Sequence, residues 1–376
     1  MADIHGTCDE RFGAACDAFA ANFDKGFDVG ASVAVYLDGE PVVDLWGGHR
    51  DAEATEPWER DTIINVWSTT KTMTFVAALL LADRGEIDLD GPVATYWPEF
   101  AANGKDGVLV RHLMAHTAGL PGWDEKIAGE DLYDWERITS LLAAQAPWWE
   151  PGTASGYHAV SQGYLIGEVV RRVTGQSFGT FFRREIAEPL GADFHVGTPA
   201  ECDDRVALVI PPGRPERPEV MPPFLVKTMT NPFLNFKQAW DVDWRRAEIP
   251  AAGGHGNARS VAAVQSVLSC GGEVRGTKLF SEATARRVLE EQAYGPDLVI
   301  GDHLRFGIGY GLNSPELPMG RGDAIAFWGG AGGSLIVNDL DRRLTFAYVM
   351  NVMRNGTVGD ERSAAILDAV YDALDA

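Results

Sequence analysis

A serine and a lysine stand three residues apart in the segment Asn65-Val-Trp-Ser-Thr-Thr-Lys71. On a helix, side chains three positions apart share one face, so the amine of Lys71 would reach the hydroxyl of Ser68. A serine beside a proton acceptor is a candidate nucleophile for attack on a carbonyl carbon. Serine is also a common helix N-cap, and a Ser-x-x-Lys match arises readily by chance. The pair therefore predicts acyl-transfer chemistry only if other parts of the chain support it.

The segment that must position this pair is predicted to be one helix over residues 65–84. Apolar residues recur in it at helical spacing and continue around its circumference, which is typical of a helix surrounded by protein. These residues are Met73, Phe75, Val76, Ala77, Leu79, Leu80 and Leu81. Gly85 follows as a stop signal. Ser68 is therefore expected at a helix N-terminus, where unpaired N–H groups and the helix dipole favour the charge of an oxyanion.

A second serine lies in Gly175-Gln-Ser177-Phe-Gly179, which matches the pattern Gly-x-Ser-x-Gly. A nucleophile elbow of that type needs an apolar strand directly before the serine. Here the preceding segment is an amphipathic helix that carries Arg171 and Arg172. We therefore predict that Gly175 ends this helix and that Ser177 is the N-cap of the next one.

Two histidines, His112 and His116, stand four residues apart, which is a spacing found among metal ligands. The glutamate of the pattern His-Glu-x-x-His is missing, because residue 113 is leucine. No third ligand cluster accompanies the pair in the sequence. We expect packing or hydrogen-bonding histidines, and neither a metal nor a cofactor.

Composition limits the partners and the compartment. The net charge of −22 argues against nucleic acid and anionic membranes as partners, since both require basic patches. The densest apolar run, residues 75–82, is too short to span a bilayer. Residues 1–12 contain no basic region followed by an apolar run, and the cysteines form no Cys-x-x-Cys pair. We therefore expect a cytoplasmic protein in which Cys8, Cys16, Cys202 and Cys270 are reduced.

Strand patterns lie at both ends of the chain and helical patterns lie mainly between them. Residues 31–37 and 41–46 predict a hairpin, and residues 324–351 alternate again. Helices are predicted over 9–24, 109–116, 131–146, 160–173, 177–190, 260–268, 281–291 and 360–374. Residues 205–250, rich in proline and aromatic residues, predict a long helix-free segment that covers a pocket. The predicted fold class is α+β.

Several motifs occur together in an order that resembles the serine β-lactamase and penicillin-binding-protein superfamily. Among its members, the chain is most similar to family VIII carboxylesterases, esterases related to class C β-lactamases. The motifs are Ser68-Thr-Thr-Lys71, His116-Thr-Ala-Gly-Leu120, Glu150-Pro-Gly152, Tyr157, Ala252-Gly-Gly254 and Trp328-Gly-Gly-Ala-Gly-Gly-Ser334. The resemblance covers nearly the whole chain.

The resemblance implies a β-lactamase-like fold, with an antiparallel sheet built from both chain ends and flanked by helices, plus an all-α domain. The implied division places residues 1–75 and 200–376 in the sheet domain and residues 76–199 in the helical domain, with the site between them. It implies Ser68 as the nucleophile, with Lys71 and Tyr157 handling its proton. The backbone N–H groups of Ser68 and Ala331 would form the oxyanion hole. Trp328 to Gly330 would lie on the edge strand of the sheet.

Two departures from the lactamase pattern bear on the substrate. The motif Tyr-x-Asn is replaced by Tyr157-His158-Ala159, and Trp328 stands where the lactamases have a lysine. Both changes remove polar groups that would hold a lactam, and apolar replacements suit an uncharged ester. The expected substrate contacts are Trp328, Gly329, Gly330, His158, Trp149 and Phe233.

These features together predict a carboxylesterase that hydrolyses short- to medium-chain acyl esters through an acyl-enzyme. The base is either a tyrosinate at Tyr157 or a neutral, desolvated Lys71, and the sequence does not choose between them. The alternatives are a β-lactamase or D-alanyl peptidase, an acyltransferase to an alcohol, and a non-catalytic scaffold on the same fold. The oligomeric state stays open.

Overall fold

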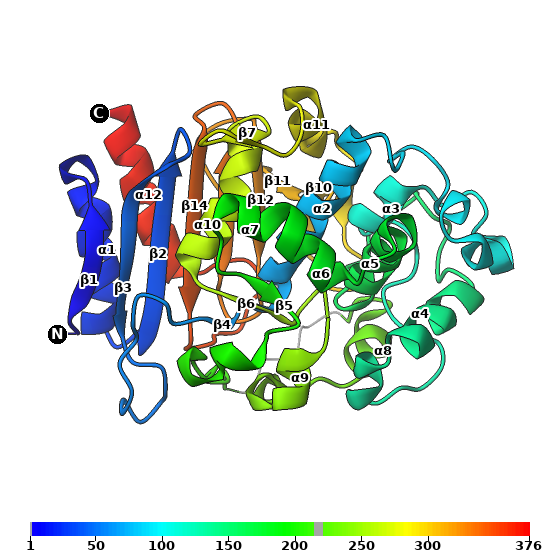
Figure 1. The fold of residues 1–376 in the computed structure, drawn as a ribbon, viewed down its shortest axis with the longest axis horizontal. Coiled ribbons are helices and arrows are strands. Elements are labelled where there is room, and N and C mark those ends of the chain that lie inside the picture. The colour runs from blue at the N-terminus through cyan, green and yellow to red at the C-terminus, as the bar shows by residue number, and fades with distance from the viewer. Residues whose placement is uncertain (1, 214–220) are drawn as a thin grey trace.

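The computed structural model describes residues 2–213 and 221–376. Its largest element among these residues is a nine-stranded antiparallel sheet, seen on the left of Figure 1. In spatial order its strands are β1 (Ile4–Cys8), β3 (Glu40–Gly48), β2 (Gly30–Leu37), β14 (Leu344–Met350), β13 (Leu335–Asp339), β12 (Ile325–Gly329), β11 (Gly311–Leu312), β10 (His303–Phe306) and β9 (Ala293–Pro296). The smaller strands are β4 (Ile64–Asn65), β6 (Gly254–Gly256) and β5 (His195–Val196) in one sheet, and β7 (Glu273–Val274) with β8 (Thr277–Lys278) in another.

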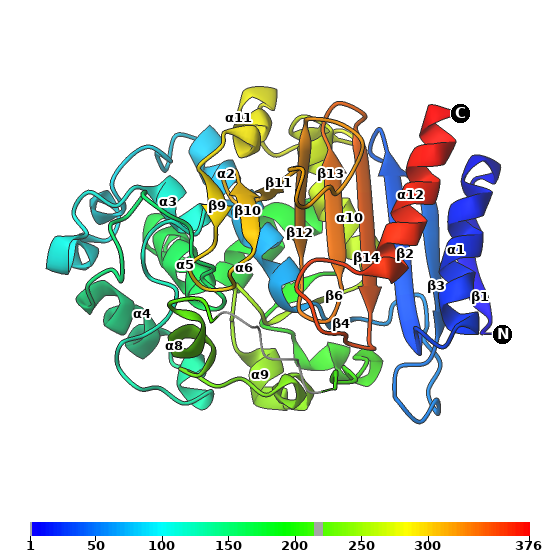
Figure 2. The ribbon, with the colours of Figure 1, turned by 180° about the vertical axis from the view of Figure 1, so that it is seen from behind.

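Helices cover both faces of the large sheet and form the opposite end of the molecule. They are α1 (Gly13–Asp24), α2 (Lys71–Asp83), α3 (Val110–Met114), α4 (Trp135–Ala144), α5 (Ser161–Thr174), α6 (Phe178–Phe182), α7 (Glu188–Leu190), α8 (Leu225–Met229), α9 (Val242–Arg246), α10 (Ala258–Ser269), α11 (Glu282–Arg286) and α12 (Glu361–Asp375). Helices α1 and α12 lie side by side on one face, as Figure 2 shows, and α10 packs on the other face. Each interface has its own core, because strand side chains alternate between the two faces.

Helix α2 lies where the sheet region meets the helical region (Figure 1). Almost all of its side chains are buried, from Lys71 to Leu81. It contacts α5 on the helical side and α10 beside the sheet. The predicted buried helix is confirmed, and its burial on all sides explains why its apolar residues occupy more than one stripe. A 3₁₀ turn, Trp67–Thr70, precedes it, so the α-helix itself begins at Lys71.

The predicted fold class is confirmed: residues from both chain ends build the antiparallel sheet, and helices flank it. Several predicted helices are shorter or interrupted, three of them most clearly. Residues 177–190 form α6, a π-helical turn and α7; residues 131–146 contain α4 after a 3₁₀ turn; and residues 281–291 contain α11 before another 3₁₀ turn. The periodic pattern indicates which residues are buried. It does not show where the backbone changes between α-helical, 3₁₀ and π-helical hydrogen bonding.

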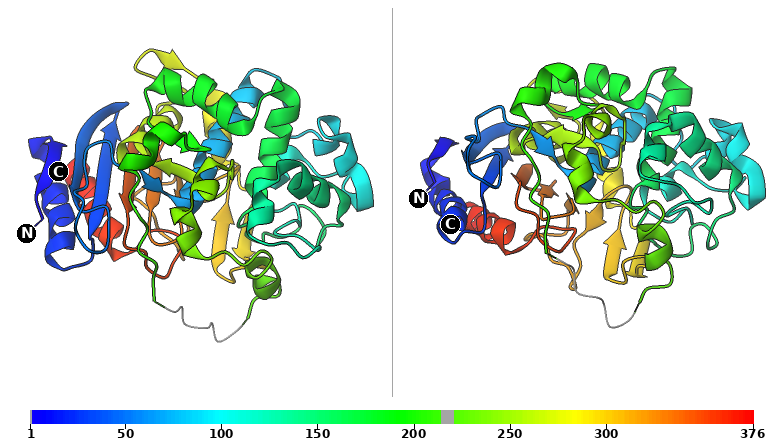
Figure 3. Two further views of the ribbon diagram at one scale, coloured as in Figure 1. Left: turned by 60° about the horizontal axis from the view of Figure 1, so that its bottom comes forward. Right: turned by 90° about the horizontal axis from the view of Figure 1, so that it is seen from below.

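The prediction of a helix-free segment over residues 205–250 was wrong for its described part. Residues 221–250 contain α8, α9 and a 3₁₀ turn at Phe236–Trp240, while residues 214–220 lie outside the described residues. Short helices fit between the prolines, because each is only about one turn long. Figure 3 shows α8 on the underside of the molecule, below β9 and β10. The backbone N–H of Phe224, just before α8, donates to Leu298 O at 3.1 Å.

The prediction that all four cysteines are reduced was wrong for two of them. Cys8 at the end of β1 and Cys16 in α1 form a disulfide, with their Cα atoms 6.9 Å apart. The chain reverses between these two elements, and this brings together two cysteines that no short motif pairs. Cys202 and Cys270 are free and buried. Within residues 2–213 and 221–376, every helix is too short or too polar to cross a membrane.

Candidate active site

Ser68 lies in the 3₁₀ turn that joins β4 to α2. The residue before it, Trp67, has a φ of 50°, in the left-handed region that bulky side chains rarely adopt. Such strain persists only where the surrounding packing holds it, and it is frequent at functional sites. Here the Trp67 ring packs against Phe236 and Trp244, with centroids 5.1 and 5.7 Å away. The packing of the Trp67 ring between Phe236 and Trp244 thus holds the turn that carries the Ser68 hydroxyl.

Lys71 places its amine next to this hydroxyl and is fully buried. Its Nζ lies 3.0 Å from Ser68 Oγ, 2.7 Å from Ala159 O and 3.0 Å from Ala251 O. Burial holds the pKa of Lys71 well below its usual value of 10.5, and no carboxylate pairs with it within the described residues. A neutral amine has two N–H donors and one lone pair, which match two carbonyl oxygens and one hydroxyl. The surroundings of Lys71 therefore suit a neutral amine that accepts the serine proton.

Tyr157 completes the contacts of the serine. Its phenolic O–H donates to Ser68 Oγ at 2.6 Å. Burial raises the pKa of Tyr157 above its usual value, against the hydrogen bond to Ser68, and Asp297 raises it further. The amine of Lys71 lies 4.9 Å from the centre of the phenol ring. Tyr157 is therefore held as a protonated phenol, able to donate a proton and poorly suited to act as a tyrosinate base.

The turn after β12 packs directly against the nucleophile turn. A Cβ added to Gly330 would lie 2.3 Å from Val66 O, so only glycine allows this approach. The hydroxyl groups of Thr69 and Ser334 are 2.9 Å apart and tie the two turns together. Among the described residues, neither the N–H of Ser68 nor that of Ala331 donates to another protein group. Both N–H groups are thus left for a substrate oxygen.

Trp328 does not lie on an edge strand, and this part of the prediction was wrong. Strand β12 pairs with β13 on one side and with β11 on the other. The β11 pairing ends at Phe327, however, so the backbone of Trp328 and Gly329 is free on the side of the site. The indole of Trp328 stacks on His116, with centroids 5.3 Å apart and planes 11° apart, and it lies 6.2 Å from the Tyr157 ring.

An apolar pocket opens beside Tyr157 and Trp328. The other residues that line it are Ile300, Leu304, Arg305, Phe306, Gly311, Leu317, Phe327, Gly329, Thr357 and Val358. Most belong to β9–β11 and the loops around them, which the sequence analysis missed. Their runs are short and lack regular alternation, so the sequence carried no usable signal for them. Trp328 and Gly329, which were predicted as substrate contacts, do line this pocket.

The other predicted substrate contacts are not brought to this pocket. His158 is fully buried, accepts a hydrogen bond from Leu120 N–H at 3.0 Å and bonds Gly156 O through Nδ1 at 2.5 Å, so its ring joins two loops. Phe233 is 70% exposed. The ring of Trp149 packs on His158 and Phe224, with centroids 5.9 and 5.5 Å away. His158 and Trp149 therefore support the loop that carries Tyr157, whereas Phe233 is largely exposed to solvent.

Ser177 is an N-cap, as predicted. Its Oγ accepts from Thr180 N–H at 3.3 Å and donates to Glu248 at 2.6 Å. Gly175 ends α5 in a left-handed conformation, with a φ of 68°. The two histidines also make backbone contacts: His112 accepts from Leu109 N–H, and His116 accepts from His158 N–H. No cluster of three or more metal-ligating side chains occurs in the described part of the chain.

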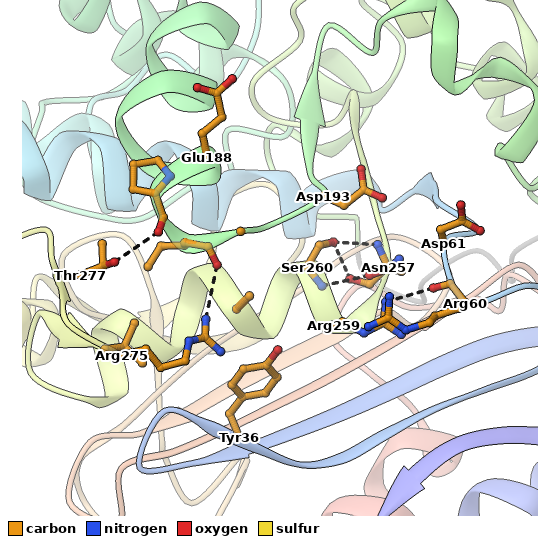
Figure 4. Close-up of a pocket in the computed structure, with 15 residues that line it drawn as sticks. Tyr36, Arg60, Asp61, Glu188, Asp193, Asn257, Arg259, Ser260, Arg275 and Thr277 are labelled. Atoms are coloured by element: carbon orange, nitrogen blue, oxygen red, sulfur yellow. Dashed lines mark hydrogen bonds between the residues drawn. The ribbon is translucent and has the colours of Figure 1, made fainter.

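A larger cavity, of about 510 Å³, lies elsewhere and contains none of the predicted site residues (Figure 4). Tyr36, Asn257 and the Arg259 and Arg275 side chains line it. Asn257 and Ser260 hydrogen bond each other as the cap of α10, and Arg259 pairs with Asp44 at 2.6 Å. These groups thus hold the fold, and among the described residues that line the cavity none is a nucleophile hydrogen-bonded to a base.

Comparisons with known proteins identify the family to which this chain belongs. A family model described as Beta-lactamase matches residues 19–371. The esterase/beta-lactamase LipL of Mycobacterium tuberculosis is 35% identical, over 93% of this chain and 83% of LipL. The crystal structure of a family VIII carboxylesterase superposes with a TM-score of 0.94 at 43% identity, covering 99% of this chain and all of the other. A penicillin-binding-protein homologue from Caulobacter crescentus superposes with a TM-score of 0.92 at 37% identity, covering 99% and 100%.

The fold and the serine–lysine–tyrosine constellation define a serine hydrolase of the β-lactamase type. The chain belongs to the beta-lactamase family.

Proposed function

We propose that this protein is a carboxylesterase that hydrolyses short- to medium-chain acyl esters through an acyl-enzyme at Ser68. The observation that carries the proposal is the position of Ser68 Oγ, 3.0 Å from Lys71 Nζ and 2.6 Å from the Tyr157 hydroxyl. The name of the family VIII carboxylesterase denotes ester hydrolysis in that protein, and the name of LipL denotes an esterase as well as a beta-lactamase. Both names support ester hydrolysis here.

In acylation, Ser68 Oγ attacks the ester carbonyl carbon while neutral Lys71 takes the hydroxyl proton. The N–H groups of Ser68 and Ala331 hold the oxyanion of the tetrahedral intermediate, which is usually the largest single contribution to such catalysis. As the intermediate collapses, Tyr157 donates its proton to the leaving alkoxide, and the ammonium of Lys71 restores the phenol. The alcohol leaves, and the acyl group stays on Ser68.

In deacylation, water takes the place of the alcohol. The Lys71–Tyr157 pair removes a proton from the water as it attacks the acyl carbonyl carbon, and Ser68 Oγ then leaves and regains a proton. The products are one carboxylic acid and one alcohol, and no metal or cofactor takes part in any step. A neutral Lys71 as the base is favoured by its burial and by the two carbonyl oxygens that take its N–H donors.

The apolar pocket beside Tyr157 supports an uncharged ester as the substrate. Trp328 replaces the lysine that would meet a lactam carboxylate, and Ala159 replaces the asparagine. The walls at Ile300, Leu304 and Phe306 are apolar and close together, which favours small groups. We propose substrate contacts for Trp328, Gly329 and Gly330. Trp149 and His158 act only through the Tyr157 loop that they support, and the exposed Phe233 is not retained as a contact.

The test is a panel of p-nitrophenyl esters of increasing acyl length, measured beside a chromogenic cephalosporin. We expect kcat/KM to be highest for short acyl chains and higher for the best ester than for the cephalosporin. A cephalosporin value equal to the best ester would favour a β-lactamase or D-alanyl peptidase. Turnover of neither would favour a non-catalytic scaffold. Adding a short alcohol distinguishes hydrolysis from acyl transfer, because transfer yields a new ester.

The site is proposed to lie between a sheet domain, residues 1–75 and 200–376, and a helical domain, residues 76–199. All strands of the large sheet come from the first set.

A cytoplasmic location belongs to the same proposal, although the Cys8–Cys16 bond points the other way, because disulfides persist in oxidising compartments. Cell fractionation with alkylation of free thiols tests the location. Protein in the cytoplasmic fraction with Cys8 and Cys16 alkylated would support it, and protein outside the cytoplasm would contradict it.

A further inference from the structure

A buried carboxylate, Asp297, lies directly behind the loop that carries Tyr157. Asp297 is 2% exposed. Its Oδ1 accepts three backbone N–H groups, from Tyr157 at 3.0 Å, Val299 at 2.9 Å and Ile300 at 3.0 Å. Within the described residues no cation pairs with it. Burial without a cation raises the pKa of Asp297, and the three N–H donors oppose this rise.

The segment after Asp297 is also joined to the Tyr157 loop through the backbone. The N–H of Leu298 donates to Ser155 O at 2.9 Å. Together with the bond from Tyr157 N–H to Asp297 Oδ1, it holds the two segments side by side. Two residues further on, Ile300 forms a wall of the apolar pocket. The loop of Tyr157, the pocket wall and the segment before α8 therefore meet at residues 297–300, because Leu298 O also accepts from Phe224 N–H.

We propose that Asp297 is a positioning residue for Tyr157, which fixes the tyrosine backbone so that the phenol stays within hydrogen-bond distance of Ser68 Oγ. This inference rests on the proposed function, because Tyr157 must handle a proton for its position to affect turnover. Asp297 lies behind the loop, bonded to main-chain N–H groups, and does not line the pocket beside Tyr157. Its effect would pass entirely through the placement of the phenol.

A double-mutant cycle tests this role. Asp297→Asn keeps an oxygen that can accept the three N–H groups and should lower kcat only slightly. We expect Asp297→Ala, which removes this acceptor, to lower kcat about tenfold with KM nearly unchanged, because a small displacement of a catalytic group costs that much or more. In a Tyr157→Phe background, the same change should alter kcat less than about twofold, since no phenol remains to be positioned. A merely structural role would lower kcat equally in both backgrounds, and this result would overturn the inference while leaving the proposed function intact. Wild-type turnover in Tyr157→Phe would instead overturn the proposed function, and this role with it.

Asp51→Ala is the matched control. Asp51 is also buried, and it accepts the backbone N–H groups of Thr55 at 2.8 Å and Glu56 at 3.0 Å, in a loop that contributes nothing to the Ser68 site. We expect it to lower the melting temperature and to leave kcat unchanged.

Amide hydrogen exchange of the unaltered enzyme supplies a second measurement that needs no variant. The N–H of Tyr157 should exchange as slowly as those of helix α2, because it is buried and bonded to Asp297. Exchange of this amide within seconds would overturn the inference even if Asp297→Ala failed to fold.

Discussion

Ser68 and Ser177 both lie at the start of a helical segment, and their surroundings differ in the features that nucleophilic attack requires. Ser177 is exposed, and its hydroxyl is occupied by Thr180 N–H and by Glu248. Ser68 caps no helix, and its hydroxyl meets an amine and a phenol. A serine motif in the sequence therefore indicates a nucleophile only when the serine hydroxyl is not used to cap a helix.

The two serines also differ in the electrostatics around them. Near Ser177, Glu248 accepts the hydroxyl proton in a hydrogen bond but is not buried, and no second proton-handling group lies beside it. Near Ser68, burial lowers the pKa of Lys71 and raises that of Tyr157, so both groups are held neutral. Two titratable groups whose pKa values are shifted in opposite directions by burial in one site are typical of an acid–base pair.

If Ser68 could be removed without loss of ester turnover, its assignment as the nucleophile in place of Ser177 would be wrong. We expect Ser68→Ala to lower ester kcat by about a thousandfold or more, leaving only what binding and the oxyanion hole provide. The measurement is ester turnover, with a fluorophosphonate label located by peptide mass spectrometry. Label on the peptide that holds Ser177 would reverse the assignment.

Removal of either proton-handling group should cost less than removal of the nucleophile. We expect Lys71→Ala and Tyr157→Phe each to lower kcat by about a hundredfold, within the range of general acid–base catalysis, without unfolding the protein. The double variant should lose far less than the product of the two factors, because the groups act as one unit. Fully multiplicative losses, measured at one pH, would show that they act independently.

The pH profile of kcat/KM sharpens the comparison further. If neutral Lys71 is the base, activity falls as the pH drops through its pKa, which burial has moved well below 10.5. Because burial raises the pKa of Tyr157, activity should then stay level up to the usual tyrosine value of 10. A rate that keeps rising through pH 10 would instead identify tyrosinate as the base. The profile of the free enzyme is measured with a neutral ester, so that only enzyme groups titrate.

The smallest effect is expected at Ser177. Ser177→Ala should lower the free energy of unfolding by about 1 kcal/mol, the usual value for a lost N-cap, with kcat nearly intact. Chemical denaturation and ester turnover of the same preparation check both parts. Ser177→Thr serves as the control, because threonine also caps helices and keeps a hydroxyl for Glu248, so stability should be nearly unchanged.

Local features of the chain were predictable from the sequence. The burial of α2, the start of its segment near Ser68, the cap at Ser177 and the strands at both chain ends all followed from side-chain periodicity and cap chemistry. These signals depend on residues within a turn or two of each other, and so survive in a single sequence. The resemblance to a known family carried Tyr157 into the predicted site, which no periodicity could have done.

The sequence by itself determined that Ser68 and Lys71 lie on one side of the helical segment that begins at Trp67, because residues three apart in a helix share a face. Only the tertiary structure decided that Ala159 O and Ala251 O receive the lysine donors, that His158 joins two loops, and that Asp297 holds the backbone of Tyr157. It also decided the Cys8–Cys16 bond. Hydrophobic pattern records how deeply a residue is buried, whereas the identity of a distant partner depends on how separate elements pack against one another.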